Sequence, residues 1–428
     1  MGPASVPGSG RDDSRSIDET SIVPTEKSDA ESSGRDNEIP KYTIDLSLPP
    51  TERYAHIARE FKPFAAQLPT LFDELVQETL PTISVTKVRH LARLTLRRLY
   101  DREENEELQG ISHIIGIEMW LLVALNVLLD LFMGCSSGGV RVDHDGRKSR
   151  MLHFRTLDWG MDPLRNIIVH LDFVKSPGGE VIGSSLGYFG YVGVLTGVRK
   201  GLSLSLNFRP NHNGNSRLEN FRFYFHILLV LLGFRQSISS LLRQCLLSPY
   251  NVSSTSSLQA QTLESIEQTL PSTATTAAYL IFSNGDRTIV MEKDSRTAVI
   301  RSADDFITVT NHDVAEEDRP RSQTVARQDL RTLQIMGMEE IVEESIFRKK
   351  DIAQLWEDSL GNSKYPKRIS SEGLINRQVL TAEQVGAWLE EYPITNEETH
   401  FATVMDPKAG KLVWVRRYTE PLEFEPES

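Results

Sequence analysis

The chain contains very little cysteine. Only Cys135 and Cys245 occur among its 428 residues, which excludes a disulfide-rich scaffold. The one bridge that two cysteines could form would consume Cys135, the residue that the motifs below single out. This scarcity favours a reducing compartment, or a fold that needs no covalent cross-links.

Long apolar runs are also missing. Residues 1–21 contain none, so we expect no secretory signal peptide and favour an intracellular protein, either cytoplasmic or peripheral to a membrane. The most apolar stretch, residues 120–132, is shorter than the roughly 20 residues that span a bilayer. Asn126 and Asp130 also interrupt it. We therefore predict a buried core helix at this position.

Positive charge is in the minority. The chain has 47 Lys and Arg against 59 Asp and Glu, a net charge of −12. Because binding to phosphates needs clustered cations, we expect no nucleic-acid partner. The sequence also lacks a Walker loop, a Gly-x-Ser-x-Gly turn and a Cys/His pattern with zinc spacing. We expect neither a cofactor nor a metal.

Composition divides the chain into three parts. Residues 1–40 are rich in Ser, Gly, Asp and Glu and contain too little apolar surface to fold, which predicts a disordered acidic tail. Residues 41–134 mostly follow helical periodicity, after a strand at 42–48, with helices expected at 51–80, 85–105 and 107–133. Residues 135–428 mix short strands with helices, which predicts layered α+β structure.

Turn-forming Gly, Pro and Asn residues separate the short apolar runs of the third part. We predict strands at 167–174, 188–195, 202–207, 277–282, 288–292, 298–301 and 306–310, helices at 217–247, 258–270, 327–344 and 381–391, and a final hairpin of 399–405 and 411–417.

Cys135 lies where the apolar helix gives way to the first strand of this part. Arg155 and Asp158 follow beyond a predicted turn at 143–146, and a hairpin there would bring both back beside Cys135. An arginine next to a thiol stabilises the thiolate, and an aspartate can hold an amine in place. Taken alone, Arg155 and Asp158 are more simply explained as a surface ion pair.

Four motifs occur in one order between residues 133 and 210. They are Cys135-Ser136-Ser137, Phe154-Arg155-Thr156-Leu157-Asp158-Trp159, Gly190-Tyr191-Val192-Gly193-Val194-Leu195-Thr196-Gly197 and Asn207-Phe208-Arg209. In order and spacing they resemble the core of the acid ceramidase and N-acylethanolamine acid amidase family, cysteine hydrolases of the choloylglycine-hydrolase group. Residues 42–54, 310–313 and 318–319 resemble further motifs of the family, so the likeness extends over residues 40–420.

The resemblance implies an N-terminal-nucleophile hydrolase fold, an αββα sandwich preceded by a helical segment. It also implies a precursor that cleaves itself between Gly134 and Cys135 into an alpha subunit, residues 41–134, and a beta subunit, residues 135–428. The Cys135 thiol would attack the Gly134 carbonyl, and water would then release a new N-terminus. The resulting α-amine has an ordinary pKa of about 8, which suits a general base.

The same resemblance implies roles for individual residues. Cys135 is the nucleophile, Asp158 orients its α-amine and Arg155 supports the thiolate. Asn311 donates its side-chain amide to the oxyanion, and Arg319 is a charge partner nearby, with Arg321 as an alternative. Two further residues are expected to line the substrate pocket, Asn207 and Tyr191.

The chain departs from the family pattern at four positions around these motifs. Phe208 replaces a Glu, and Phe154, Thr156 and His312 replace Gly, Asn and Tyr. These changes leave the nucleophile and its expected Arg, Asp and Asn partners intact. Hydrolysis therefore remains the expected activity.

The expected substrate also comes from the resemblance. The family cleaves the amide between a long acyl chain and an amino alcohol, which implies a fatty-acyl amide. We expect ceramide first, because residues 42–54 and 190–197 look closer to the ceramidase branch, and an N-acylethanolamine second. A non-catalytic lipid-binding relative is the third interpretation, favoured by Phe208. A peripheral membrane contact is expected with any of these, and a lysosomal or vacuolar location is implied by the resemblance alone.

Overall fold

The computed structural model describes residues 38–128, 134–144, 148–210, 212, 216–247, 261–314, 338–361 and 380–423. All of them belong to one compact unit that begins at Glu38. The predicted acidic tail lies outside the described residues except for residues 38–40. Of these, Ile39 is buried, and the carbonyl of Pro40 accepts a hydrogen bond from the amide of His170. The folded part of the chain therefore starts slightly earlier than composition indicated.

The segment before Cys135 is one strand followed by helices. These are β1 (Lys41–Asp45), α2 (Pro50–Arg53), α3 (Ala55–Ala65), α4 (Leu68–Thr79), α5 (Val85–Thr95), α6 (Arg102–Ile115) and α7 (Met119–Leu128). The predicted helix at 51–80 is divided into three. Its second break, between α3 and α4, precedes Pro69, which lies in the first turn of α4 and cannot continue α3. The predicted helix at 107–133 is divided at Gly116, whose φ of 79° ends α6.

Helix α7 is a core helix, as predicted. Leu122, Val123 and Ala124 are all buried, and the helix packs into the main apolar core. A helix that is apolar on every side is stable only when it is covered on every side. In the part of the chain that the structure describes, no helix is long and apolar enough to cross a membrane.

The remaining chain builds most of two sheets. The larger has the order β1-β4-β5-β6-β7-β8-β9-β10 and the smaller β11-β2-β3-β12-β13. Their strands are β2 (Gly134–His144), β3 (Lys148–Asp158), β4 (Ile168–Val174), β5 (Val181–Tyr188), β6 (Thr196–Arg199), β7 (Leu202–Phe208), β8 (Ala278–Ser283), β9 (Thr288–Asp294), β10 (Thr297–Ala303), β11 (Phe306–Val309), β12 (Thr399–Asp406) and β13 (Lys411–Arg417).

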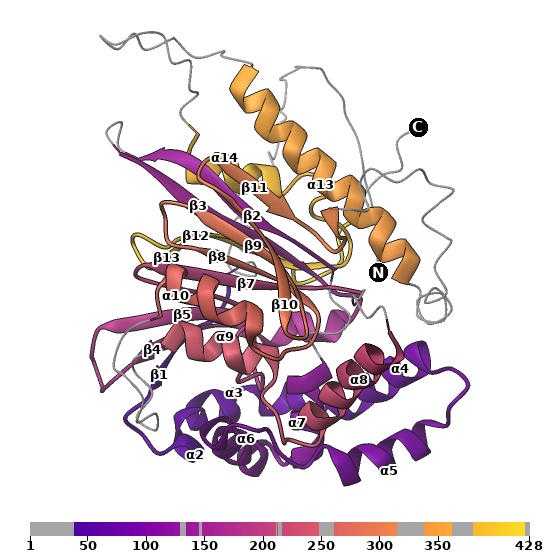
Figure 1. Ribbon diagram of the computed structural model, residues 1–428. Helices are drawn as coiled ribbons and strands as arrows, with labels where there is room; N and C mark the ends of the chain where they lie inside the picture. The colour runs from indigo at the N-terminus through magenta and orange to yellow at the C-terminus, as the bar shows by residue number, and fades with distance from the viewer. Residues whose placement is uncertain are drawn as a thin grey trace, which may run out of the picture. The chain divides into compact units, whose positions relative to one another are not determined.

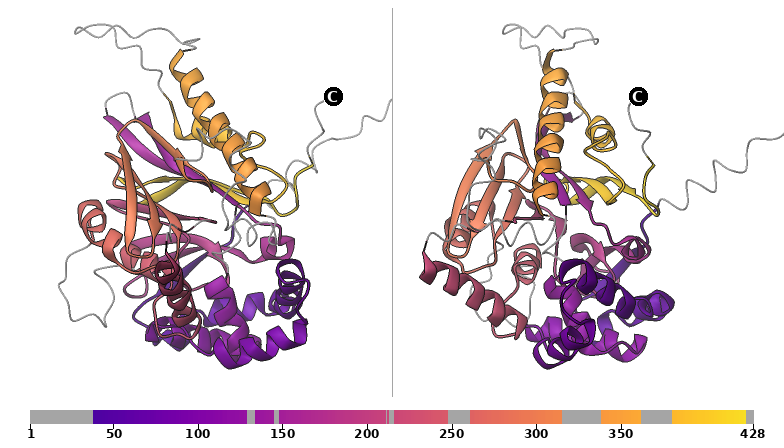
Figure 2. Two further views of the ribbon diagram at one scale, coloured as in Figure 1. Left: turned by 45° about the vertical axis from the view of Figure 1, so that its right-hand side comes forward. Right: turned by 90° about the vertical axis from the view of Figure 1, so that its right-hand side faces the viewer.

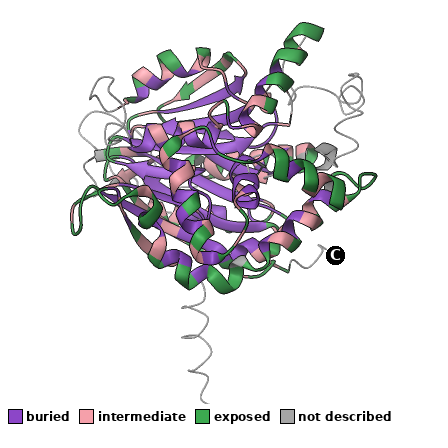
Figure 3. Cartoon of the chain, turned by 90° about the horizontal axis from the view of Figure 1, so that it is seen from below, coloured by how far each residue is buried: buried purple, intermediate pink, exposed green. Residues whose placement is uncertain are grey.

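The two sheets stack face to face, with β2 and β3 against β7 and β8. Helix α9 (Ile238–Leu247) covers the outer face of the larger sheet, and α13 (Met338–Gly361) and α14 (Ala382–Leu389) cover that of the smaller sheet (Figures 1 and 2). Buried residues concentrate in the sheets and exposed ones in the surrounding helices (Figure 3). The predicted α+β class and its αββα layering are confirmed.

Several predicted elements differ from the structure. The strand expected at 188–195 is wrong, because β5 ends at Tyr188 and Gly190 follows with a φ of 85°. The helix expected at 217–247 is two helices, α8 (Arg217–Leu231) and α9, divided at Gly233 with a φ of 68°. A Cβ atom at Gly233 would lie 2.5 Å from the Arg98 carbonyl oxygen, so this break requires glycine.

The helices expected in the last third are found only in part. Residues 327–337 lie outside the described residues, and α13 continues well past the expected end at 344. The helix expected at 381–391 is α14, and the final hairpin of β12 and β13 is confirmed. Short helical turns complete the fold at η2 (Asp162–Ile167), α10 (Leu263–Thr269) and η3 (Leu270–Ser272).

Candidate active site

Cys135 is the second residue of β2, in the middle layer of the fold. The β2–β3 hairpin predicted from the sequence is formed, although residues 145–147 at its turn lie outside the described residues. Its register places Gly134 opposite Asp158 and Ser137 opposite Arg155. Cys135, Arg155 and Asp158 are all fully buried or nearly so, so the hairpin brings them together inside the protein rather than in a surface ion pair.

Arg155 links the thiol to the facing sheet. Its Nη2 donates to Cys135 Sγ at 3.4 Å, and its Nη1 donates to the Leu206 carbonyl at 2.6 Å on β7. Burial raises the pKa of the Cys135 thiol, and the Arg155 guanidinium is the strongest of the groups that oppose this rise. The uncleaved chain therefore keeps Cys135 as a protonated thiol at neutral pH, beside a cation that favours the thiolate.

Asn311 contacts the nitrogen of Cys135 directly. Its Oδ1 accepts a hydrogen bond from the Cys135 amide at 2.8 Å, while its Nδ2 donates to the Phe208 carbonyl at 2.8 Å. Asn311 lies just after β11, and its own amide donates to Ser345 Oγ on α13 at 2.7 Å. The sequence predicts that Nδ2 donates to the oxyanion of the reaction. In the uncleaved chain the Oδ1 of Asn311 faces the Cys135 amide.

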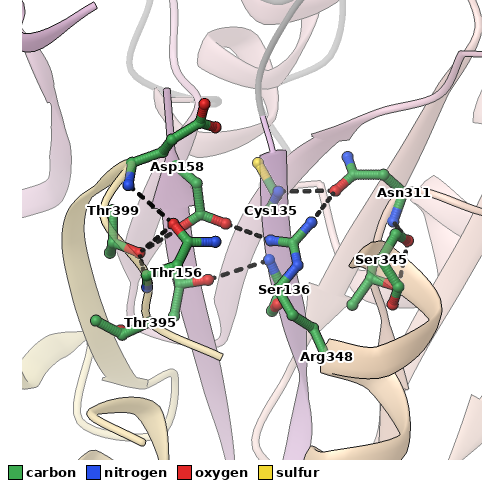
Figure 4. A network of polar contacts seen from close by, with 12 residues as sticks. Cys135, Ser136, Thr156, Asp158, Asn311, Ser345, Arg348, Thr395 and Thr399 are labelled. Atoms are coloured by element: carbon green, nitrogen blue, oxygen red, sulfur yellow. Dashed lines mark hydrogen bonds and ion pairs between the residues drawn. The ribbon is translucent and has the colours of Figure 1, made fainter. Parts of the chain in front are cut away.

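Asp158 has a partner at each carboxylate oxygen. Thr399 Oγ1 donates to its Oδ1 at 2.8 Å, and Arg348 forms an ion pair with its Oδ2. Burial raises the pKa of Asp158, and Arg348 is the strongest of the groups that oppose this rise. Arg348 also donates to Asn311 Oδ1 at 3.1 Å. Its guanidinium thus lies between Asp158 and Asn311, next to Cys135 (Figure 4).

Arg348 is the site residue that sequence reasoning missed. It lies on α13 in the stretch Phe347-Arg348-Lys349-Lys350, which has the composition of a solvated helix surface. The family motifs pointed instead to Arg319, with Arg321 as an alternative, and both lie outside the described residues. The available signal was the helical position of Arg348 three residues after the buried Ser345, and that spacing alone does not identify a site.

The two residues expected to line the pocket have different surroundings. Asn207 lies on β7, where its Oδ1 accepts from Ser137 Oγ at 2.7 Å and from Arg155 at 3.2 Å. Its Nδ2 donates to the Val309 and Thr310 carbonyls, which fixes the residues before Asn311. Tyr191 is buried in the loop after β5, in the apolar core that also contains α7.

The structure also contains an apolar pocket. It encloses about 430 Å³ of space, part of it open to solvent. Its lining comes from three places, namely α4 (Leu68, Leu71, Phe72, Leu75), α7 (Leu121, Ala124, Leu125) and the residues after β3 (Trp159, Met161, Leu164). Trp159, which lines the pocket, directly follows Asp158 of the buried polar network in the sequence.

The described residues contain no group of three or more His, Cys, Asp or Glu side chains that could hold a metal ion. The groups that the structure gathers around Cys135 are its thiol, two guanidinium groups, one carboxylate and amide side chains. Such a set can perform nucleophilic acyl transfer once a base is available near the sulfur.

Comparisons with known proteins point in one direction. Residues 37–100 match the model of a family described as the beta subunit of N-acylethanolamine-hydrolyzing acid amidase. The matched residues lie almost entirely in the segment 41–134, for which the sequence predicts an alpha subunit.

Curated proteins of two kinds are similar to parts of the chain. Acid ceramidase of Rattus norvegicus is 29% identical over 191 residues, which are 41% of this chain and 47% of that protein. N-acylethanolamine-hydrolyzing acid amidase of Caenorhabditis elegans is 30% identical over 179 residues, 39% of this chain and 47% of that protein. The chain thus spans about half the length of the curated relatives it matches. A solved C. elegans ortholog of the latter enzyme is 22% identical, with a TM-score of 0.40 over 64% of this chain and 93% of that chain.

Proposed function

We propose that the chain, which belongs to the acid ceramidase and N-acylethanolamine acid amidase family, is a self-cleaving hydrolase of fatty-acyl amides. Its proposed nucleophile is Cys135. The observation that carries the proposal is the position of Cys135 at the start of β2. Its sulfur contacts Arg155, and its nitrogen contacts Asn311. A residue whose thiol and backbone nitrogen both have dedicated buried partners is suited to act through both.

Self-cleavage is the first step of the proposed chemistry. The Cys135 sulfur attacks the Gly134 carbonyl carbon, the bond from that carbon to the Cys135 nitrogen breaks, and the nitrogen takes up the thiol proton. Water then hydrolyses the thioester, leaving a carboxylate on Gly134 and a free thiol on Cys135. Gly134 suits this position because a Cβ atom there would lie close to Asp158, 3.2 Å from its Cβ and 3.3 Å from its Oδ2.

Amide hydrolysis repeats this chemistry on a bound substrate. The α-amine of Cys135 accepts the thiol proton, the thiolate attacks the substrate carbonyl, and the returned proton allows the amino alcohol to leave. Water then releases the fatty acid from the thioester. In this scheme Arg155 favours the thiolate and Asn311 holds the amine through its Oδ1. The Nδ2 of Asn311 can donate to the oxyanion only after its hydrogen bond to the Phe208 carbonyl breaks.

The apolar pocket is the proposed site of the acyl chain. Its walls come from both pieces of the chain, from α4 and α7 on one side and from residues 159–164 on the other. Each buried methylene contributes about 0.8 kcal/mol, so a long acyl chain favours binding strongly.

The exposed apolar face of α8 supports delivery of the substrate from a membrane surface. Leu218, Phe221, Phe225 and Leu228 recur at helical spacing, and all are exposed. A helix with such a face beside cationic residues, here Arg222, is typical of proteins that lie on lipid surfaces. We propose a peripheral contact of this kind.

Ceramide is the proposed first substrate, because several of the curated relatives are acid ceramidases, including those of Rattus norvegicus and Homo sapiens. An N-acylethanolamine is the alternative, favoured by the family match over residues 37–100. The two amides share the acyl chain and differ in the amino alcohol. Parallel assays with the same acyl group on both head groups distinguish them.

The decisive experiment follows the self-cleavage. The purified 48.3 kDa chain is analysed by denaturing gel and intact mass, and the N-terminus of its large fragment is sequenced. We expect a new terminus at Cys135 and turnover of an acyl amide, both lost in Cys135→Ala and both kept in Cys245→Ala, the matched control at the other buried cysteine. A chain that stays intact and inert at every pH would favour the non-catalytic lipid-binding interpretation instead.

A further inference from the structure

Arg348 of α13 contacts two of the groups around the Cys135 nitrogen. It forms an ion pair with Asp158 on β3 and donates to Asn311 Oδ1 after β11. Its exposed fraction is only 2%. Because a buried cation is costly unless it is paired, this arrangement fixes all three side chains relative to one another.

The amide of Asn311 has only one orientation that satisfies these contacts. Two donors, the Cys135 amide and Arg348 Nη2, point at its Oδ1, and a carbonyl accepts from its Nδ2. Turning the amide over would place an NH₂ group against two donors and an oxygen against the Phe208 carbonyl. After self-cleavage the new α-amine therefore meets an uncharged acceptor, while the carboxylate of Asp158 is held by Arg348.

We propose that Arg348 is a positioning residue that fixes Asn311 and Asp158 beside the Cys135 nitrogen. Its charge keeps the released α-amine neutral at lower pH, so that the amine can act as a base there. This inference rests on the proposed function, because the α-amine exists only after self-cleavage.

The charges around Cys135 support the direction of this effect. Arg155 and Asp158 face it from β3, Arg348 from α13 and Tyr188 from β5. Burial raises the pKa of Tyr188 well above its ordinary value, so it is uncharged. Two cations and one carboxylate therefore surround the amine. Arg165 and Glu398 interact with Asp158 from further away. Burial raises the pKa of Glu398 to about 7.

Removal of Arg348 has the same sign whether Asp158 is ionised or protonated. An ionised Asp158 without its partner attracts an ammonium group. A protonated Asp158 leaves the amine without the repulsion of a nearby cation. In both cases the charged form of the amine becomes more stable, so its pKa rises.

The test is the pH dependence of kcat/KM for an acyl amide, measured on the self-cleaved protein and its variants. In Arg348→Gln we expect the acidic limb of the profile to move to higher pH by about one unit or more, as for loss of a charge within a few ångströms. Arg348→Lys keeps the charge, so its limb stays near that of the unchanged protein, but kcat falls because an ammonium group cannot bridge Asp158 and Asn311 as a guanidinium does. Lys350→Gln removes an exposed charge from the same helix and serves as the matched control.

The outcomes separate the two proposals. A protein that cleaves itself and hydrolyses the amide, but whose Arg348→Gln limb coincides with that of Lys350→Gln, overturns the role of Arg348 and leaves the proposed function standing. If Arg348→Gln does not fold, Arg348→Lys decides: unchanged kcat overturns the positioning role, and reduced kcat with an unmoved limb supports it. A chain that never cleaves itself overturns both proposals together.

Discussion

The two pieces of the chain share a buried charge cluster whose loss should be costly. Glu107 on α6 is fully buried between Arg53 on α2 and Arg243 on α9. Arg53 donates to its Oε1 at 2.9 Å and Arg243 at 2.7 Å. Arg53 and Glu107 precede the proposed cleavage site and Arg243 follows it. The cluster therefore joins residues that belong to different polypeptides after cleavage.

Replacing Glu107 by Gln keeps the volume but removes the carboxylate that pairs with the buried Arg243. Arg53 loses one of its two carboxylate partners and keeps Glu103. Breaking a buried ion pair by removing one partner typically costs about 3–5 kcal/mol of unfolding free energy. For a domain of this size that corresponds to a fall in Tm of about 4–6 °C. We expect this loss in thermal scans, and we expect it to persist in high salt because buried charges are poorly screened.

Glu106 provides the matched control one residue away. Its ion pair is with Arg102, whose side chain is 92% exposed, and such surface pairs contribute about 0–1 kcal/mol. Glu106→Gln should therefore be nearly as stable as the unchanged protein. Adding Arg243→Gln to Glu107→Gln should cost less than the sum of the two single changes, because it removes the uncompensated cation. Equal Tm values for Glu107→Gln and Glu106→Gln would refute the reasoning.

Three further changes test other parts of the structure. Asn311→Ala removes the acceptor of the Cys135 nitrogen and should lower kcat of the cleaved enzyme by about 100-fold or more, with an unchanged circular dichroism spectrum. Ala124→Phe fills the apolar pocket, so KM should rise for long-chain amides and not for short-chain ones in the same assay. Glu104 is buried, and burial raises its pKa to about 8. The folded state therefore binds this proton more tightly than the unfolded state does. The free energy of unfolding should accordingly decline as pH rises toward 8. Glu104→Gln should flatten that decline in urea denaturation series at several pH values, and an equally steep decline would contradict it.

Sequence reasoning could predict the parts of the site that are close in the chain. Cys135, Arg155 and Asp158 lie on one hairpin, and strand register alone brings them together. Asn311 follows β11, which pairs with β2, so its proximity to Cys135 depends on a pairing between distant strands. It was predicted only through resemblance to a family motif. The direction of its amide depends on Phe208 and Arg348, and no motif records it.

The fold was predictable to a similar depth. The buried helix α7 and the final hairpin follow from periodicity and turn residues, which are local signals. The division of helices at Gly116 and Gly233 depends on single glycines with positive φ, and at Gly233 on the close approach of Arg98. Arg348 illustrates the limit: its neighbours in sequence are charged, and only the docking of α13 on the smaller sheet buries it.

The geometry of the uncleaved chain also indicates why a single event can activate the site. Before cleavage the thiol of Cys135 is protonated, because burial raises its pKa. At that stage its nitrogen is an amide, which cannot act as a base. On the proposed chemistry, cleavage of the Gly134–Cys135 bond converts that nitrogen into an amine whose acceptor, Asn311 Oδ1, is already 2.8 Å away. Because the partners of both the sulfur and the nitrogen are in place beforehand, activation requires little reorganisation around Cys135 apart from the release of Asn311 Nδ2 from the Phe208 carbonyl. Dipoles that are already in place are those that stabilise a transition state best.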